Sequence, residues 1–394
     1  MLKELGAKYR AHLDRDVIPY WLKNAPDKEC GGYFTCFDRR WQLYDDRKYM
    51  WLQGRLLWMF SRLYNQWERR PEFLEAAAVG APFVLDRGRD ADGRIFFSLT
   101  RDGRPLHFQR KPYGAVFCQM GLLEYYRATG DSACHAEAVA LFDRIAGWIA
   151  EPTALGRPRT DGPAFSSLAD CMVVASMALE LAEAFPEEAR FRETIRSSIP
   201  AILRHLHPEK RVLIEFAALD ERSAEMARGW PESRFFNPGH SIEVAWFLLH
   251  LLEYFPDPDV EATALEVTAQ SFATGWDPEW GGFYNFMDLE GRPCLQPEAN
   301  MKYFWPLNEA IYACTLAWFK TGDSRWLDRL EIADRYAFDK FVDTEHGGWF
   351  GYCDRRGELV LDCKGGNYMS FFHVPRSLMM TAQLIEQGGN LANR

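Results

Sequence analysis

One pattern recurs along this chain and limits what it can fold into: Gly and aromatic residues alternate around a turn. Clear copies are "ECGGYFTCFDRRWQLY" from Glu29, "DADGRIFFSLTRDGRPLHF" from Asp90, "WGGFYNFMDLEGRPCL" from Trp280 and "HGGWFGYCDRRGELVL" from His346. A weaker copy, "EKRVLIEFAALDERSAEM", begins at Glu209. Alternation on both sides of a turn that contains Gly or Asp is typical of a short β-hairpin. The sequence therefore predicts hairpins at regular intervals.

The segments between these copies read as pairs of helices. Each copy is followed by a helical stretch rich in Trp, Phe, Leu and Met, and then by a more polar helical stretch. The spacing of roughly 60–70 residues leaves room for about six units in the chain. Six pairs of one apolar and one polar helix close into a double ring without exposed ends. We predict an all-α fold, an (α/α)6 barrel with short β-hairpins in the loops at one end, in which residues 1–394 form a single catalytic domain.

Prolines mark the expected starts of the inner helices, because Pro is tolerated where the first helical N–H has no partner. These residues are Pro112, Pro163, Pro238, Pro306 and Pro375. Polar groups beside such starts should lie together at one mouth of the barrel. The residues in question are Arg55, His240, Glu243, Glu309, His373 and Arg376.

The segment "NPGHSIEVAWFLL" places a histidine in the first turn of an otherwise apolar helix. Asn237 is a plausible helix cap, and Pro238 fits the first helical position. A helix N-terminus disfavours imidazolium, so we expect His240 to be a neutral base near pH 7, with Glu243 orienting its ring. The alternative is a histidine that makes only structural hydrogen bonds near the cap.

A second histidine, His373, precedes Arg376 in "FFHVPRSLMM". A cation in the first turn of a helix is disfavoured unless an anion or a ligand compensates it. Two histidines with an arginine and glutamates suit proton transfer at a carbon next to a carbonyl, which leads to epimerisation or to aldose–ketose isomerisation. A glycoside hydrolase that uses Glu243 and Glu309 as its carboxylates, and a non-catalytic sugar-binding protein, are the remaining alternatives.

Composition excludes other classes. Aromatic residues make up 15% of the chain, which suits a stacked helical core or a sugar-binding cleft, and the net charge of -10 argues against nucleic-acid and anionic-membrane partners. The nine cysteines are scattered without a CxxC pair, so we expect a reduced, cytoplasmic protein. No apolar run approaches membrane-spanning length, and no metal-ligand spacing appears, so we predict no metal site.

Several longer segments resemble the N-acylglucosamine 2-epimerase family, which is related to cellobiose 2-epimerases and aldose–ketose isomerases. They are "YDDRKYMWLQGRLLWMFSRLY", "LTRDGRP", "NPGHSIEVAWFLL", "GWDPEWGGFYNFMD", "GGWFGYCDRRGE" and "FHVPRSLMM". The resemblance implies an (α/α)6 barrel and cofactor-free proton transfer at C2 of a small sugar through an enediolate. It also implies catalytic roles for four residues: His240, His373, Glu243 and Glu309. We expect the substrate-binding residues to be Arg55, Trp51, Trp305, Tyr113, Asp170 and Arg376, and the protein to be a homodimer.

The chain departs from the family pattern at segments expected to line the mouth. Leu307 replaces a histidine, "ADCMVVAS" introduces Asp170 and Cys171, "YGAVF" spans Tyr113 to Phe117, and "NYMSF" follows "KGG". We predict interconversion of N-acyl-D-glucosamine and N-acyl-D-mannosamine. The alternatives are a free-hexose epimerase or aldose–ketose isomerase acting on glucose, mannose or fructose, and a cellobiose 2-epimerase. The same departures argue against carrying over the nucleotide (ATP) activation known in the family.

Overall fold

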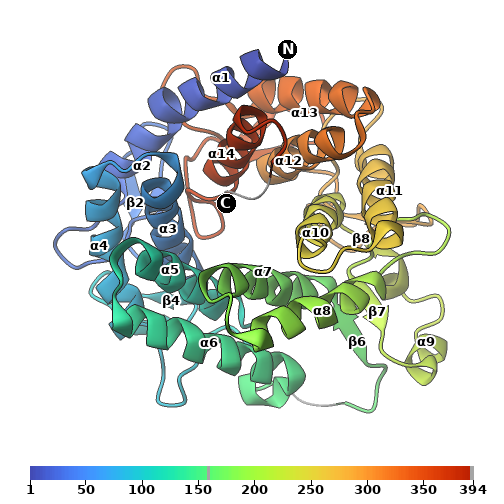
Figure 1. Ribbon diagram of the computed structural model, residues 1–394, viewed down its shortest axis with the longest axis horizontal. Helices are drawn as coiled ribbons and strands as arrows, with labels where there is room; N and C mark the ends of the chain where they lie inside the picture. The colour runs from blue at the N-terminus through green and yellow to red at the C-terminus, as the bar shows by residue number, and fades with distance from the viewer. Residues whose placement is uncertain (158–159, 391–394) are drawn as a thin grey trace.

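Two concentric layers of helices build the computed structural model, which describes residues 1–157 and 160–390 (Figure 1). The inner layer consists of α3 (Met50–Arg62), α5 (Tyr113–Thr129), α7 (Leu168–Ala184), α10 (Pro238–Leu251), α12 (Phe304–Thr321) and α14 (His373–Glu386). Each packs against an outer partner: α4 (Pro71–Asp86), α6 (Ser132–Ala150), α8 (Ala189–Leu203), α11 (Pro258–Gly275), α13 (Arg325–Phe341) and α1 (Leu2–His12). This arrangement confirms the predicted (α/α)6 barrel.

The last inner helix takes its outer partner from the other end of the chain. Helix α1 packs against α14 beside α13, as Figure 1 shows. Lys8 pairs with Asp334 of α13 at 2.7 Å, and Arg10 pairs with Glu386 of α14 at 2.9 Å. Tyr9 between them is fully buried. A π-helical turn (Leu13–Val17) and α2 (Ile18–Asn24) then lead into the first loop.

The two layers differ in how their residues are buried. Helix α10 buries nearly every residue, whereas α13 buries only one stripe, at three- and four-residue spacing. A helix that is apolar all round belongs inside, and an amphipathic one belongs at the surface. In the described residues, no helix combines the length and apolar character needed to cross a membrane. All nine cysteines are free.

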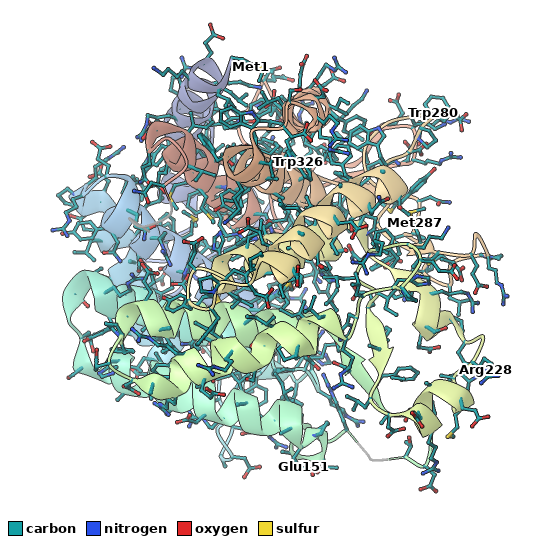
Figure 2. All side chains as sticks on the ribbon, turned by 45° about the vertical axis from the view of Figure 1, so that its right-hand side comes forward. Met1, Glu151, Arg228, Trp280, Met287 and Trp326 are labelled. Carbon is teal, nitrogen blue, oxygen red and sulfur yellow. The ribbon has the colours of Figure 1, made fainter. Side chains whose placement is uncertain are left out.

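Short strands gather at one end of the barrel, the end on the right of Figure 2 with Met287 and Arg228. They are β1 (Cys36–Phe37), β2 (Leu43–Asp45), β3 (Lys48–Tyr49), β4 (Ser98–Leu99), β5 (Pro105–His107), β6 (Phe165–Ser167), β7 (Phe216–Ala218), β8 (Phe235–Phe236), β9 (Met287–Asp288), β10 (Lys302–Tyr303), β11 (Tyr352–Cys353) and β12 (Leu359–Leu361). The hairpins predicted from Glu29, Asp90 and His346 form as β1–β2, β4–β5 and β11–β12.

The other two predicted hairpins are wrong. Strand β9, from the copy at Trp280, pairs with β8, and β7, from the copy at Glu209, pairs with β6. Both pairings join segments about 50 residues apart in the chain, so these strands link one repeat to another instead of forming a hairpin within one repeat. The alternation of residue types along a segment predicts a β-strand, but the strand with which it pairs depends on which other strand lies beside it in the folded barrel.

Buried ion pairs fix three of the loops. Lys48 contacts Asp27 at 2.9 Å, Lys302 contacts Asp277 at 3.0 Å, and Lys364 contacts Asp343 at 2.6 Å, all with nearly complete burial. Each aspartate also accepts hydrogen bonds from an arginine: Arg101, Arg355 or Arg39. Because Lys48 and Lys302 directly precede α3 and α12, these pairs fix where the inner helices begin.

Proline marks the inner-helix starts less regularly than the sequence predicts. Pro238 is the first residue of α10, and Pro112 caps α5, as predicted. Pro306 and Pro375 lie at the third position of α12 and α14, where a missing N–H is still harmless. Pro163 is the exception: it precedes β6, so the strand separates it from α7.

Candidate active site

A cavity of about 760 Å³ opens at the hairpin end, where the inner helices begin. Its volume lies in the range of small-molecule sites. Seven of the predicted residues line it: Trp51, Arg55, His240, Glu243, Trp305, His373 and Arg376. These residues come from α3, α10, α12 and α14. The convergence predicted from the helix starts is therefore present.

The segment Asn237-Pro238-Gly239-His240 explains how His240 is placed. The Asn237 Oδ1 atom accepts the His240 N–H at 3.0 Å, which makes Asn237 the cap of α10 and His240 its third residue. A Cβ on Gly239 would lie 2.3 Å from the Trp305 ring. Glycine is therefore required for Trp305 to pack here, and the Trp305 ring lies 5.3 Å from the His240 ring.

The ring of His240 is held by Glu215, a residue that the sequence analysis missed. The His240 Nδ1 atom lies 2.9 Å from Glu215 Oε1, so Nδ1–H donates to the carboxylate and Nε2 is left for a substrate. Burial lowers the pKa of His240, but the charge and hydrogen bond of Glu215 outweigh it, aided by Glu243 and Glu309, and the pKa is raised. The prediction that Glu243 orients this ring is wrong: Glu215 does so, and its negative charge raises the pKa that a helix N-terminus by itself would lower.

His373 has the opposite electrostatic environment. Its Nδ1 atom lies 2.8 Å from Glu309 Oε1, while Glu309 Oε2 accepts the Trp246 indole N–H at 3.0 Å. Burial, followed by the positive charges of Arg55 and Arg376, lowers the pKa of His373 well below its ordinary value. Glu309 is buried behind His373 and does not line the cavity, so its contact with a substrate would be indirect.

Arg376 occupies the position that a metal ion could otherwise take. Ligand atoms of Glu243, Glu309 and His373 lie within 4.8 Å of one another, which is a possible metal-binding geometry. However, the Arg376 guanidinium donates to Glu243 Oε1 at 2.5 Å and to Glu309 Oε1 at 2.6 Å. A guanidinium already pairs with both buried carboxylates, so this donor set does not fit an added metal.

Arg55 is a buried cation surrounded by rings. Its guanidinium carbon lies 4.1 Å from the Phe117 centroid, with Trp51 and Phe372 at 4.5 and 4.6 Å. Its Nε atom has no hydrogen-bond partner, and no carboxylate of the described residues forms an ion pair with it. Burial and the neighbouring Arg376 lower its pKa to about 9. Such a group is ready to stabilise a developing oxyanion.

Aromatic rings form the remaining walls. The Trp305 ring lies 5.5 Å from that of His373 and so contacts both histidines. The Trp51 indole N–H donates to the Asn367 carbonyl at 2.9 Å, and its ring meets Tyr368 edge-on. Asn367 and Tyr368 belong to the "NYMSF" segment, which therefore lines the cavity.

Some predicted residues lie outside this cavity. Tyr113 lines a smaller adjoining space of about 170 Å³, and its hydroxyl donates to Asp170 at 3.0 Å. Asp170 and Cys171 are not among the lining residues, and Leu307 is completely buried. Of the departures noted in the sequence, those that reach the lining are Val116 and Phe117, then Met172, Val173 and Ser176, and finally Asn367 and Tyr368.

The sequence alone does not identify Glu215 as a partner of His240. It stands in "VLIEFAAL", the degenerate hairpin copy, as the single carboxylate in an apolar run. Glu215 directly precedes β7, and a buried acid needs a partner. The identity of that partner depends on how the segment from Glu215 to His240 folds.

Known proteins resemble this chain over most of its length. The family model for N-acylglucosamine 2-epimerase (GlcNAc 2-epimerase) matches residues 32–377. The chain is 38% identical over 390 residues to the N-acylglucosamine 2-epimerase of Bos taurus, covering 97% of this chain and 90% of that protein. The chain belongs to the N-acylglucosamine 2-epimerase family. The human N-acylglucosamine 2-epimerase is 36% identical, with 95% and 88% of the two chains covered.

Solved structures of sugar epimerases and isomerases share the fold. A cellobiose 2-epimerase from Spirochaeta thermophila superimposes with a TM-score of 0.82 at 22% identity, covering 98% of each chain. A D-mannose isomerase gives a TM-score of 0.82 at 17% identity, covering 96% of this chain and 97% of that one. At these identities the similarity shows that the (α/α)6 barrel is common to this group.

Proposed function

We propose that this chain is an isomerase that interconverts N-acyl-D-glucosamine and N-acyl-D-mannosamine by moving the proton at C2. The observation that carries the proposal is the pair of histidines on one cavity with pKa values shifted in opposite directions. Titratable groups whose surroundings separate their pKa values are the usual sign of an acid and a base. The identity to mammalian N-acylglucosamine 2-epimerases over nearly the whole chain supports this substrate.

In the proposed mechanism, neutral His373 is the base for one epimer of the open-chain sugar. Its Nε2 atom removes the C2 proton, and the electron pair of the broken C–H bond moves toward the C1 carbonyl to form an enolate whose negative charge lies on the C1 oxygen. Arg55 stabilises the negative oxygen, since it is a buried cation without an ion-pair partner among the described residues. Protonated His240 then donates from Nε2 to the opposite face of C2. The reverse reaction uses the same pair with exchanged roles.

Two carboxylates position this pair without touching the reacting atoms. Glu309 and Glu215 each accept the Nδ1–H of one histidine, which directs Nε2 toward the cavity. Glu243 faces the cavity and neutralises Arg376. Trp51 and Trp305 supply apolar walls against which a sugar ring can stack.

Proton NMR in heavy water tests this function directly. We expect deuterium to enter C2 of N-acetylglucosamine and N-acetylmannosamine, with each sugar converted into the other. Mannose, glucose and cellobiose are tested as separate substrates. Exchange in mannose but in neither N-acetyl sugar would replace the proposed substrate with a free hexose. Release of reducing ends from an oligosaccharide would instead indicate a glycoside hydrolase.

We further propose that the reaction needs no cofactor and no ATP, because the acid, the base and the oxyanion-stabilising group are all side chains. Rates measured after dialysis against a chelator, with and without ATP, test this. A rate that rises severalfold with ATP would show that the family's nucleotide activation extends to this chain.

Cytoplasmic location and a homodimeric state are also proposals. Free cysteines at all nine positions support a reducing compartment. Cell fractionation tests the location, and sedimentation velocity at micromolar concentration tests the oligomeric state; a single monomer species would reject the dimer.

A further inference from the structure

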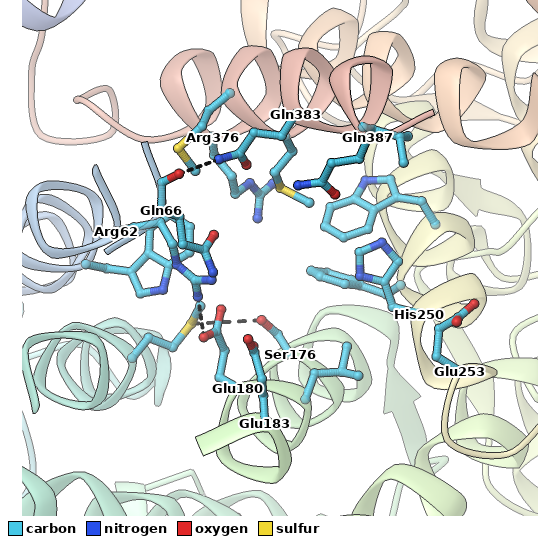
Figure 3. A pocket seen from close by; sticks show the side chains of 18 of the residues that line it. Arg62, Gln66, Ser176, Glu180, Glu183, His250, Glu253, Arg376, Gln383 and Gln387 are labelled. Carbon is cyan, nitrogen blue, oxygen red and sulfur yellow. Dashed lines mark hydrogen bonds and ion pairs between the residues drawn. The ribbon is translucent and has the colours of Figure 1, made fainter. Parts of the chain in front are cut away.

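The barrel contains a second cavity at the opposite end, where the inner helices finish. It measures about 410 Å³ and is shown in Figure 3. Arg62 comes from the end of α3, Glu180 and Glu183 from the last turns of α7, and Gln383 from the last turn of α14. Four residues line both cavities, and they mark the layer between them: Met120, Ser176, Phe247 and Arg376.

Polar groups converge on this second cavity from several helices. In Figure 3, Arg62 and Gln66 lie on one side of the open space, and Arg62 is paired with Glu180, beside which Glu183 and Ser176 lie. His250 lies on the opposite side, and Gln383 lies above. The aromatic residues Trp58, Trp246 and Tyr254 also line it. Amides, carboxylates and a guanidinium beside aromatic faces form the kind of lining that binds hydroxyl groups and a sugar ring.

Two buried donors in the lining are unused. The Trp58 indole N–H and the Arg62 Nε–H have no hydrogen-bond partner, although these residues are only 4% and 5% exposed. Both residues line the cavity. A buried donor without a partner costs free energy, and a bound acceptor that pairs with it would recover that cost.

The charges of the lining select against anions. Arg62 is already paired with Glu124 and Glu180, and Glu183 pairs with Arg127. Glu253 adds a third carboxylate to the wall, paired with Lys320 at its edge. Since each cation already has a carboxylate partner, a phosphate or carboxylate ligand would meet net repulsion. A neutral ligand with several hydroxyl groups fits this balance.

We propose that the second cavity binds a neutral, polyhydroxylated ring of monosaccharide size, separately from the site of catalysis. Hydroxyl oxygens accept from Trp58 and Arg62, hydroxyl hydrogens are donated to Glu180 and Glu183, and the ring packs against the aromatic wall. This inference does not depend on the proposed function, because binding here would hold whether or not the chain epimerises sugars.

Equilibrium dialysis with a locked sugar tests the inference. The probe is radiolabelled methyl glycoside of N-acetylglucosamine, which cannot open its ring and therefore cannot react. Gln387→Trp introduces a large ring at an exposed position that lines the cavity, so folding should be unaffected. We expect this variant to bind one equivalent fewer than the wild type. Met226→Trp, on exposed surface of the short helix α9 (Glu221–Met226), is the matched control and should bind as the wild type does.

Two further measurements keep the test decisive. Met380→Trp fills the cavity from a half-buried position and should also lose one equivalent. The negatively charged methyl glucuronide should bind equally to the wild type and to Gln387→Trp, because the second cavity rejects it. Equal binding of the neutral glycoside by the wild type and both filled variants would overturn the inference, as would loss of glucuronide binding in Gln387→Trp.

Discussion

The two histidine-bearing walls of the catalytic cavity differ although their central residue is the same. On the α10 wall, His240 is 26% exposed and contacts one carboxylate, Glu215. On the α14 wall, His373 is 13% exposed and has two guanidiniums, Arg55 and Arg376, as electrostatic neighbours. Burial lowers both pKa values, and the neighbours then decide the outcome: the pKa of His240 is raised and that of His373 is lowered further. In the proposed mechanism, this difference in neighbouring charge makes His240 the acid and His373 the base.

This difference predicts which protonation state is active. Between the two pKa values, His373 is neutral and His240 is protonated, which is the pair that the proposed reaction needs. Activity should fall at low pH as His373 gains a proton, and at high pH as His240 loses one. Substitutions confined to one wall should therefore affect one histidine and leave the other unchanged.

The largest effect should come from removing either imidazole. His240→Asn and His373→Asn should each reduce epimerisation by about 10²–10⁴-fold, the usual contribution of a positioned acid or base. Exchange of the C2 proton with deuterium from heavy water distinguishes the roles of the two histidines. His240→Asn retains the base His373, so it should still exchange the C2 proton of one epimer without forming the other.

His373→Asn should show the complementary behaviour, with exchange confined to the other epimer. Circular dichroism of both variants should match the wild type. If one variant exchanges both epimers at the wild-type rate, its histidine is not part of the pair.

Arg55→Lys should have the next largest effect. Lysine retains a charge but loses the planar fork that lies among Trp51, Phe117 and Phe372. Loss of an oxyanion-stabilising group costs about 10²–10³-fold in kcat. Steady-state kinetics should show this loss in kcat more than in KM. Arg228→Lys, an exposed change, is the control, and an unchanged kcat for Arg55→Lys would leave Arg55 with a structural role.

Glu215→Gln should act on the α10 wall alone. Without this carboxylate, burial dominates and the pKa of His240 falls. In the plot of kcat against pH, the fall of activity at high pH should therefore begin at a lower pH. At a fixed alkaline pH, kcat should drop about tenfold for each pH unit by which this fall moves. The acid limb, which belongs to His373, should stay in place. Movement of the acid limb instead would show that the two histidines are assigned to the wrong limbs.

How far the sequence leads can be judged from single residues. The hairpin repeats and apolar helices predict the ring, since their periodicity is local and survives any detail of packing. Pro238 and Asn237 predict where α10 begins for the same reason. The pairing of His240 with Glu215 could not be predicted, because the two residues are 25 positions apart and meet only through the fold of the segment between α8 and α10, where the Glu215 N–H donates to the Phe235 carbonyl.

The same limit applies to the second half of the site. Glu243 was expected beside His240 because both lie in the first turns of α10, yet it pairs with Arg376 of α14, 133 positions away. Leu307 and Asp170 were expected in the lining because they lie near inner-helix starts. A helix turns its residues through every direction, so position along the axis does not decide which of them face the cavity.

The smallest effect should come from Gly239→Ala, which disturbs both walls equally. The new Cβ would lie 2.3 Å from the Trp305 ring, and Trp305 contacts both histidines. Overpacking of this kind costs about 1–3 kcal/mol in the free energy of unfolding. The displaced ring should lower kcat severalfold while both pH limbs stay where they are, since Glu215 and the arginines are untouched.

Gly114→Ala is the matched control because Gly114 is likewise the second residue of its inner helix, α5, and its Cβ would meet only an ordinary contact at 3.5 Å. The control should keep wild-type activity and gain stability, as alanine favours a helix over glycine. Chemical denaturation and pH profiles of the two variants decide the matter: a displaced limb in Gly239→Ala would mean that Trp305 also sets the pKa of a histidine.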